Sequence, residues 1–143
     1  MEPDNEKQDK DEKKIEGCKV CVVEDDKFFR QLLEKKLTSA GATVDFAENG
    51  EIALKTVRDG NFDIIILDLM LPGMDGFDFL RERGKDKKSA HIPVIILSNF
   101  GDTTQIDTAK KLGVRSYLIK AAVSMQTVVD EIKKVLDTAH KES

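Results

Sequence analysis

The sequence lacks several features that would place a chain of this size in other functional classes. It has no apolar run of about 18 residues that could cross a bilayer, and its charged N-terminus has no apolar stretch of the kind found in secretory signals. It has no excess of positive charge, since 23 Lys and Arg stand against 27 Asp and Glu, and a pI near 5.3 is untypical of an electrostatic nucleic-acid binder. The G-x-x-x-x-G-K-[ST] and G-x-G-x-x-G loops are missing, which excludes the usual cradles for ATP and dinucleotides. We therefore expect a cytoplasmic protein without membrane insertion or direct nucleic-acid contact.

Cysteine is also scarce, and the two that are present do not form a credible redox or metal site. Cys18 and Cys21 are spaced C-x-x-C, but they lie in an apolar segment of strand character, where residues i and i+3 point to opposite faces. A zinc site would have only His91 and His140 to complete it. We predict that both cysteines are buried structural residues.

The 143 residues are enough for one domain, and 40% of them are hydrophobic. Residues 1–16 consist mainly of Asp, Glu and Lys and could bury too little surface to fold, so we expect a disordered charged tail. A single folded domain is expected over residues 17–140.

Short apolar runs of strand length alternate with segments of helical period along that domain. The runs are Val20–Val23, Thr43–Ala47, Ile64–Leu67, Val94–Leu97 and Tyr117–Ile119. The helical segments begin after the capping residues Asp26, Asn49, Asp75 and Asp102, and the last one carries the apolar stripe from Met125 to Val135. Strands that are apolar on both faces belong to parallel sheets covered by helices. The pattern predicts a doubly wound α/β domain of five βα units.

Polar residues follow four of the five predicted strands, at the edge where an open α/β sheet binds its ligands. Glu24 and Asp25 follow the first strand and Asp68 the third, so three carboxylates would meet there. Their mutual repulsion would be relieved by a hard divalent cation, and carboxylates with phosphate oxygens suit Mg²⁺. Ser98 after the fourth strand and Lys120 after the fifth could both contact phosphoryl oxygens. The combination predicts a phosphoryl site.

Without a nucleotide cradle, the phosphoryl group must arrive already activated. A strand-end carboxylate could then be the nucleophile and form an aspartyl phosphate. Asp68 is the natural candidate because it ends the most apolar strand and precedes the loop Leu71–Gly76.

These residues resemble the response-regulator receiver domains of two-component signalling. Four landmarks match in order, and the likeness runs from about Lys19 to Leu136. They are Val22–Asp26, Ile66–Gly76 with its D-x-x-x-P-x-x-D-G block, Ile95–Ser98 and Tyr117–Lys120. The resemblance implies a flavodoxin-like five-stranded parallel sheet of order 2-1-3-4-5 with five helices.

The resemblance also assigns roles. It implies that Asp68 accepts a phosphoryl group from a histidine kinase or histidine phosphotransfer protein. Mg²⁺ would be bound by Asp25, Asp68 and the backbone carbonyl of Met70, with Glu24 acting through water.

The resemblance further implies which residues respond to phosphorylation. Ser98 would be the switch hydroxyl, and Lys120 would contact the phosphoryl group. Tyr117 resembles the aromatic switch residue, so a downstream protein would bind the face formed by the fourth helix, fifth strand and fifth helix. The protein is then a phosphoacceptor that assists its own phosphorylation and dephosphorylation, and not an enzyme.

Two departures from the family pattern carry expectations of their own. Ala121 stands where the family usually has a proline, often in cis, and a non-proline cis bond costs about 2.5–4 kcal/mol, so we predict a trans Lys120–Ala121 bond. Met70 and Phe100 occupy the positions that influence dephosphorylation, and neither can orient a water by hydrogen bonding. We therefore expect a long-lived phosphoryl-aspartate.

Two other interpretations of the sequence compete with that of a receiver domain. A haloacid-dehalogenase-type phosphatase would need a second acid where Met70 stands, and usually a longer chain with a cap. A pure binding module, either a degenerate receiver or a flavin-binding domain, is disfavoured by the filled receiver positions and by three acids where a flavin phosphate would lie. Because a receiver and a tail use up the length, output is expected through another protein, unless the chain is part of a longer one.

Overall fold

A computed structural model describes residues 14–142 of the chain and the side chains of residues 14–139. Five strands form one sheet in the order β2-β1-β3-β4-β5, and every neighbouring pair is parallel. The strands are β1 (Lys19–Val23), β2 (Thr43–Ala47), β3 (Ile64–Leu67), β4 (Val94–Ser98) and β5 (Ser116–Ile119). The predicted doubly wound α/β fold and its strand order are therefore confirmed.

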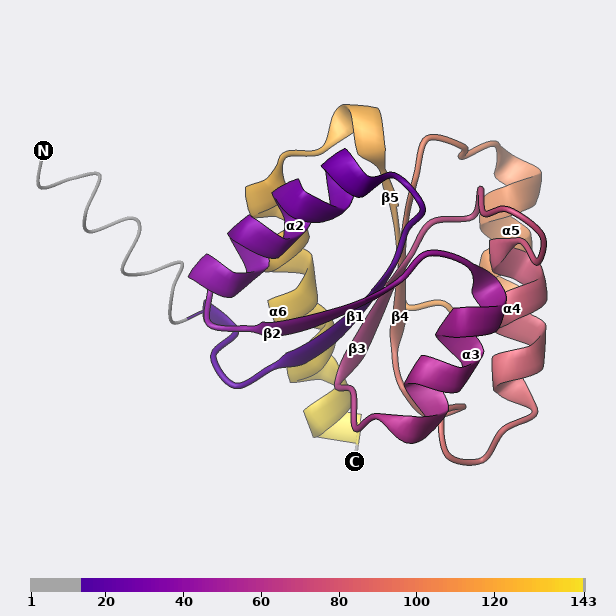
Figure 1. The fold of residues 1–143 in the computed structure, drawn as a ribbon, viewed down its shortest axis with the longest axis horizontal. Helices are drawn as coiled ribbons and strands as arrows, with labels where there is room; N and C mark the ends of the chain where they lie inside the picture. Colours follow the sequence, from indigo (N-terminus) through magenta and orange to yellow (C-terminus); the bar gives the residue numbers. More distant parts are fainter. Residues whose placement is uncertain (1–13, 143) are drawn as a thin grey trace, which may run out of the picture.

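Four helices connect the strands, and a short 3₁₀ turn and a fifth helix follow the last strand, so that helices cover both faces of the sheet. They are α2 (Lys27–Ser39), α3 (Gly50–Asp59), α4 (Gly76–Gly84), α5 (Thr103–Lys111), the 3₁₀ turn η1 (Lys120–Ala122) and α6 (Met125–Glu142). Figure 1 shows α2 and α6 on one face and α3, α4 and α5 on the other.

The four predicted capping residues start their helices as expected. Asp26, Asn49, Asp75 and Asp102 each accept a hydrogen bond from the backbone N–H three residues on. Asp102 and Gln105 complete a reciprocal capping box. Because Asp26 and Asp102 follow the ends of β1 and β4 by only a few residues, they fix where the loops after these strands turn into helix.

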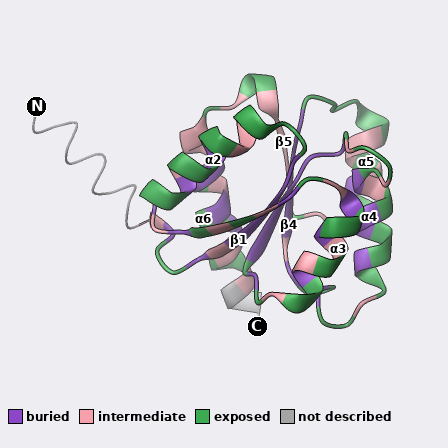
Figure 2. Cartoon of the chain, in the orientation of Figure 1, coloured by how far each residue is buried: buried purple, intermediate pink, exposed green. Residues whose placement is uncertain are grey.

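The core is divided by the sheet into two layers, because successive side chains of a strand point to opposite faces. On the face of α2 and α6, Val20, Val22 and Ile66 pack with Leu33 and Ile132. On the face of α3, α4 and α5, the alternate strand residues pack with the helices, namely Cys21, Val23, Ile65, Leu67, Val57, Phe79 and Ala109. Figure 2 shows this burial concentrated in the strands and the inner sides of the helices.

The cysteines behave as structural residues, as predicted. Cys18 belongs to the layer under α2 and α6 and Cys21 to the layer under α3 to α5, so the two thiols lie on opposite faces of the sheet. Both are free, and burial raises the pKa of each thiol to about 12.

The predicted tail over residues 1–16 lies mostly outside the described residues. At its end, Ile15 is buried, and its N–H donates to the carbonyl of Ala40 at 3.0 Å. Lys14 forms an ion pair with Asp130 of α6. Packing against the sheet domain therefore begins at least two residues before Gly17.

A buried arginine, which no sequence pattern predicts, holds the connection between α4 and β4 in place. Arg83 is 5% exposed, and its Nη1 lies 2.9 Å from the carbonyl oxygens of Ser89, Ala90 and Ile92. Burial lowers the pKa of this guanidinium. The side chain thus holds a non-helical segment against the end of α4.

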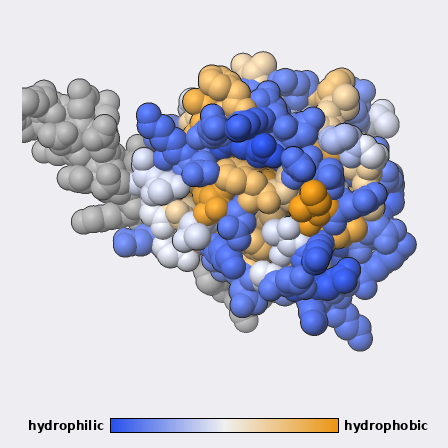
Figure 3. Space-filling view, in the orientation of Figure 1, coloured by the Kyte–Doolittle hydropathy of each residue, from blue (hydrophilic) through white to orange (hydrophobic). Residues whose placement is uncertain are grey.

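On the face shown in Figure 3, the described surface is largely hydrophilic, with apolar side chains between α2 and α3. A groove at this place is lined by Arg30, Phe46 and Ile52, among others. Among residues 14–142, no helix is long and apolar enough to pass through a membrane.

Candidate functional site

Three acidic residues meet where the central strands β1 and β3 end. Glu24 and Asp25 directly follow β1, and Asp68 directly follows β3, its neighbour in the sheet. The N–H of Asp68 donates to the carbonyl of Val23 and that of Glu24 to the carbonyl of Ala47, each at 3.0 Å. Sheet hydrogen bonding therefore continues to the acids themselves and fixes their backbone positions.

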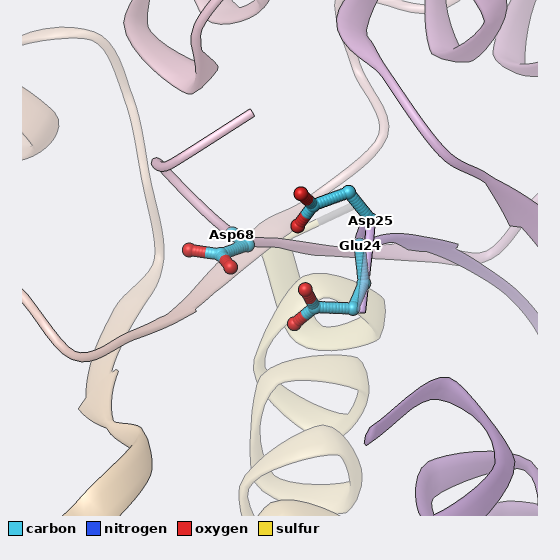
Figure 4. Close-up of side chains that lie close together, drawn as sticks. All are labelled: Glu24, Asp25 and Asp68. Carbon is cyan, nitrogen blue, oxygen red and sulfur yellow. The ribbon is translucent and has the colours of Figure 1, made fainter. Parts of the chain in front are cut away.

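The carboxylates of these residues form one cluster. One oxygen from each of Glu24, Asp25 and Asp68 lies within 4.8 Å of the other two, and Figure 4 shows the side chains of Glu24 and Asp25 extending to the side where Asp68 lies. Glu24 is 2% exposed and Asp68 6%, whereas Asp25 is open to solvent. The cluster is thus partly buried, with Asp25 on its solvent-exposed side.

Lys120 joins the cluster from the end of β5. Its ammonium lies 2.9 Å from Oδ2 of Asp68 and forms an ion pair with Glu24, and its side chain is only 13% exposed. Burial by itself lowers the pKa of this amine, but the hydrogen bonds to Glu24 and Asp68 raise it overall, so Lys120 is charged. The ammonium of Lys120 thus contacts two of the three carboxylates in the cluster.

The charge of the cluster is unbalanced on the acidic side. Burial raises the pKa of Glu24 to about 7, against the opposing effects of Lys120 and of the Asp26 N–H, which donates to the Glu24 carboxylate at 3.1 Å. Hard oxygen donors with an excess of negative charge are what Mg²⁺ requires, and the exposed Asp25 leaves an approach from solvent. The residues present therefore fit a divalent cation.

The loop after β3 presents the carboxylate of Asp68. The N–H of Met70 donates to Asp68 Oδ1 at 3.1 Å, so both oxygens of Asp68 have a hydrogen-bond donor. The loop returns close to itself at Gly76, where an added Cβ would lie 2.7 Å from the Cα of Leu69 and 2.9 Å from the carbonyl oxygen of Asp68. Only glycine fits this approach without displacing the backbone that carries Asp68.

Ser98 ends β4, the other neighbour of β3, and is fully buried. Leu67 pairs with Ile96, so Ser98 lies two residues beyond that pair, at the same edge of the sheet as Asp68. Its hydroxyl accepts a hydrogen bond from the N–H of Phe100 at 3.3 Å. The side chains of Phe100 and Met70 are exposed, at 44% and 57%.

Tyr117 lies one strand further out. Its hydroxyl donates to the backbone carbonyl of Phe100, which ties β5 to the loop that follows Ser98. Burial, with Asp102 and Asp68 nearby, raises the pKa of this phenol, so it is a hydrogen-bond donor at neutral pH.

The structure brings Glu24, Asp25, Asp68 and Lys120 together as the sequence predicts, and it adds a residue that the sequence does not point out. The ring of Phe29 lies under Lys120, with the ammonium 4.5 Å from the ring centroid. In the sequence, Phe29 belongs to an apolar helical stripe whose default role is core packing. The Lys120–Ala121 bond is trans, as predicted, since no cis peptide occurs among the described residues.

Comparisons with known proteins agree with this geometry. The model of the response regulator receiver domain family matches residues 20–133. The chemotaxis protein CheY of Pseudomonas aeruginosa is 31% identical over 120 residues, which cover 83% of this chain and 96% of that protein. The transcriptional regulatory protein AfsQ1 of Streptomyces coelicolor is 34% identical over 124 residues, 87% of this chain and 53% of its own length.

A solved structure of a receiver domain also resembles this chain in both sequence and fold. The receiver domain of the Francisella response regulator 1452 is 30% identical, with a TM-score of 0.78 over 85% of this chain and 98% of that one. Whereas the chain spans nearly all of CheY, it spans only about half of the transcriptional regulator.

Proposed function

The chain belongs to the response regulator receiver domain family, and from that premise we propose that Asp68 is the residue on which it receives a phosphoryl group. Membership makes the chain a phosphorylation-activated signalling domain and not a classical enzyme. The phosphoryl group would come from a histidine kinase or a histidine phosphotransfer protein.

One observation carries the assignment to Asp68. Its carboxylate is the only one of the three that is both bonded to Lys120 and placed at the end of the central strand β3, with the N–H of Met70 on its other oxygen. Glu24 is also bonded to Lys120, but its side chain is shut off from solvent, with 2% exposure, so a phosphoryl donor cannot reach it. Asp25 is a poor candidate for the opposite reason, because its side chain is exposed and lies on the outer side of the cluster.

The transfer step follows from these positions. A carboxylate oxygen of Asp68 attacks the phosphorus of a phosphohistidine on a histidine kinase or histidine phosphotransfer protein. The P–O bond forms as the P–N bond breaks, and the electron pair of that bond returns to the imidazole nitrogen. Lys120 neutralises charge on the transferred phosphoryl oxygens, and the buried Ser98 hydroxyl is a donor to one of them once its loop moves inward.

Asp25, Asp68 and the backbone carbonyl of Met70 would hold Mg²⁺, with Glu24 contributing through water. When bound, the cation neutralises negative charge that would otherwise repel the incoming phosphoryl group. Lys120 and Asp25 then have separate tasks, because the ammonium lies on the buried side of the cluster and Asp25 on the open side.

The signal would leave through the face formed by α5, β5 and α6. The bond from the Tyr117 hydroxyl to the Phe100 carbonyl supports this proposal, because movement of the Ser98 loop would break or shift it. A downstream protein that binds this face would sense the change. A cytoplasmic location and the division into a tail over residues 1–16 and a receiver over residues 17–140 stay predictions, with the packing of Ile15 favouring an earlier boundary.

The test is intact mass after incubation with Mg²⁺ and a small acyl phosphate. We expect the mass of one phosphoryl group to be added to the wild-type protein and to Asp78→Ala, an exposed control on α4, and to be absent from Asp68→Ala. Equal addition to Asp68→Ala would show that the acceptor is another residue.

A further inference from the structure

The side chain of Lys120 has an unusual surrounding on the side away from its acidic partners. Its ammonium lies over the ring of Phe29 at 4.5 Å from the centroid, while Glu24 and Asp68 bind it from the other side. A cation within about 6 Å of an aromatic face is attracted by the ring quadrupole, and more strongly when the pair is shielded from water. With 13% side-chain exposure, Lys120 meets that condition.

Phe29 is itself held firmly. Its N–H donates to the Asp26 side chain at 3.1 Å in the first turn of α2, and its ring packs against the core layer under α2 and α6. The neighbouring Phe28, by contrast, is 70% exposed. Of the two adjacent phenylalanines, one therefore faces solvent and the other supports Lys120.

Lysine needs such support more than most residues. Its ammonium is a point charge on a flexible four-carbon chain. Here the chain departs from η1, a three-residue 3₁₀ turn whose two remaining residues are alanines, so the turn offers little side-chain packing of its own. Because Phe29 belongs to α2 and not to the segment that carries Asp68, the contact of its ring with Lys120 does not depend on the hydrogen bond between Lys120 and Asp68.

We propose that Phe29 is a positioning residue for phosphoryl transfer, whose ring holds the Lys120 ammonium beside Asp68. This inference rests on the proposed function of Asp68 and adds a residue to it. The ring acts through Lys120 and touches no phosphoryl group itself, so its effect should follow the aromatic face and not the apolar volume.

The experiment compares Phe29→Leu, Phe29→Tyr and the control Phe28→Leu in the full chain. The first measurement is the rate of phosphorylation by a small acyl phosphate at saturating Mg²⁺. Phe29→Leu should be slower by about threefold to thirtyfold, the range given by a partly buried cation–π contact. Phe29→Tyr and Phe28→Leu should stay within about twofold of wild type.

The second measurement is the ¹⁵N–¹H resonance of the Lys120 ammonium, assigned by its loss in Lys120→Met. It should show an upfield ring-current shift in the wild type and in Phe29→Tyr, and none in Phe29→Leu. The resonance shows whether the ring lies over the ammonium in solution. The rate separates a positioning role from a merely structural one, because Phe29→Tyr restores it and Phe29→Leu does not. If Phe29→Leu fails to fold, as judged from its two-dimensional spectrum, Phe29→Met takes its place.

The outcomes separate the two ideas. An unchanged rate in Phe29→Leu, or an equally slow Phe29→Tyr, overturns the positioning role. If the wild-type protein gains no phosphoryl group at all, the proposed function fails, and the resonance alone decides whether the ring holds the ammonium.

Discussion

The ammonium of Lys120 and the carboxylate of Asp68 lie 2.9 Å apart although 52 positions separate them in the chain. The contact spans the edge of the sheet from β3 to β5, across the end of β4. Since Glu24 binds the same ammonium, one side chain joins the ends of three strands.

Replacing Lys120 by methionine should therefore have two opposite effects. Without the ammonium, two buried carboxylates lose their counter-charge, so the free energy of unfolding in metal-free buffer should fall by about 1–3 kcal/mol. Mg²⁺ should bind more tightly, because it no longer competes with a fixed cation, while phosphorylation slows by about a hundredfold. Urea denaturation and Mg²⁺ titration calorimetry test this, with the exposed Lys110→Met as the control. Weaker Mg²⁺ binding in Lys120→Met would contradict the geometry.

Mg²⁺ should stabilise the folded protein, because the carboxylate cluster exists only in the folded state. At a concentration ten times the dissociation constant, the gain is about 1.4 kcal/mol, or about 4–7 °C in Tm for a domain of this size. Thermal melts with and without Mg²⁺ measure it. Asp68→Ala should reduce the shift, whereas Asp78→Ala should keep it in full; equal shifts in both would remove Asp68 from the metal site.

Replacing Arg83 should lower the free energy of unfolding and leave the rate of phosphorylation unchanged. Arg83→Met leaves the carbonyls of Ser89, Ala90 and Ile92 without their donor, and we expect a loss of about 2–4 kcal/mol in the free energy of unfolding. Arg81 on the same helix is 52% exposed and pairs with Asp78 at 3.5 Å, so Arg81→Met should cost no more than about 0.5 kcal/mol. Urea denaturation gives both values. A similar cost for the two variants would mean that the buried contacts contribute little.

The lifetime of the phosphoryl group should be set partly by Met70 and Phe100. Both side chains are exposed, two residues after Asp68 and two residues after Ser98, and neither can hold an attacking water by hydrogen bonding. The double variant Met70→Asn, Phe100→Glu should lose its phosphoryl group about tenfold faster or more, because a polar side chain can then orient water. Decay of the added mass after removal of the donor measures the rate. A wild-type half-life of seconds that the substitutions leave unchanged would contradict this expectation.

Both cysteines should be inert in the native protein. With each pKa raised to about 12 by burial, almost no thiolate exists at pH 8, and access is blocked as well. Alkylation followed by mass spectrometry should be at least about a hundredfold slower than in urea, where ordinary thiol pKa values near 8.5 return. Rapid modification of the native protein would show that the segment around β1 opens easily.

The sequence predicts that the three acids and Lys120 lie close together, because the positions of these residues depend only on where strands end. Apolar runs locate those ends, and parallel strands bring them to one edge. Phe29 and Arg83 are not predictable in this way. In the sequence, Phe29 is one of several apolar residues in a helical stripe, and its contact with Lys120 depends on the course of the chain after β5. Arg83 resembles an ordinary basic residue near a helix end, and its carbonyl partners lie in a segment without periodic pattern.

Main-chain hydrogen bonds from Asp68 to Val23 and from Glu24 to Ala47 hold the backbone of the two acids in place independently of their carboxylates. Neither bond involves a side chain, so the carboxylates can be removed one at a time while the strand ends stay where they are. Variants such as Asp68→Ala should thus keep the fold and the surface of the protein while losing the carboxylate that accepts the phosphoryl group. Such copies would let the binding of a phosphoryl donor be studied apart from the transfer that follows it.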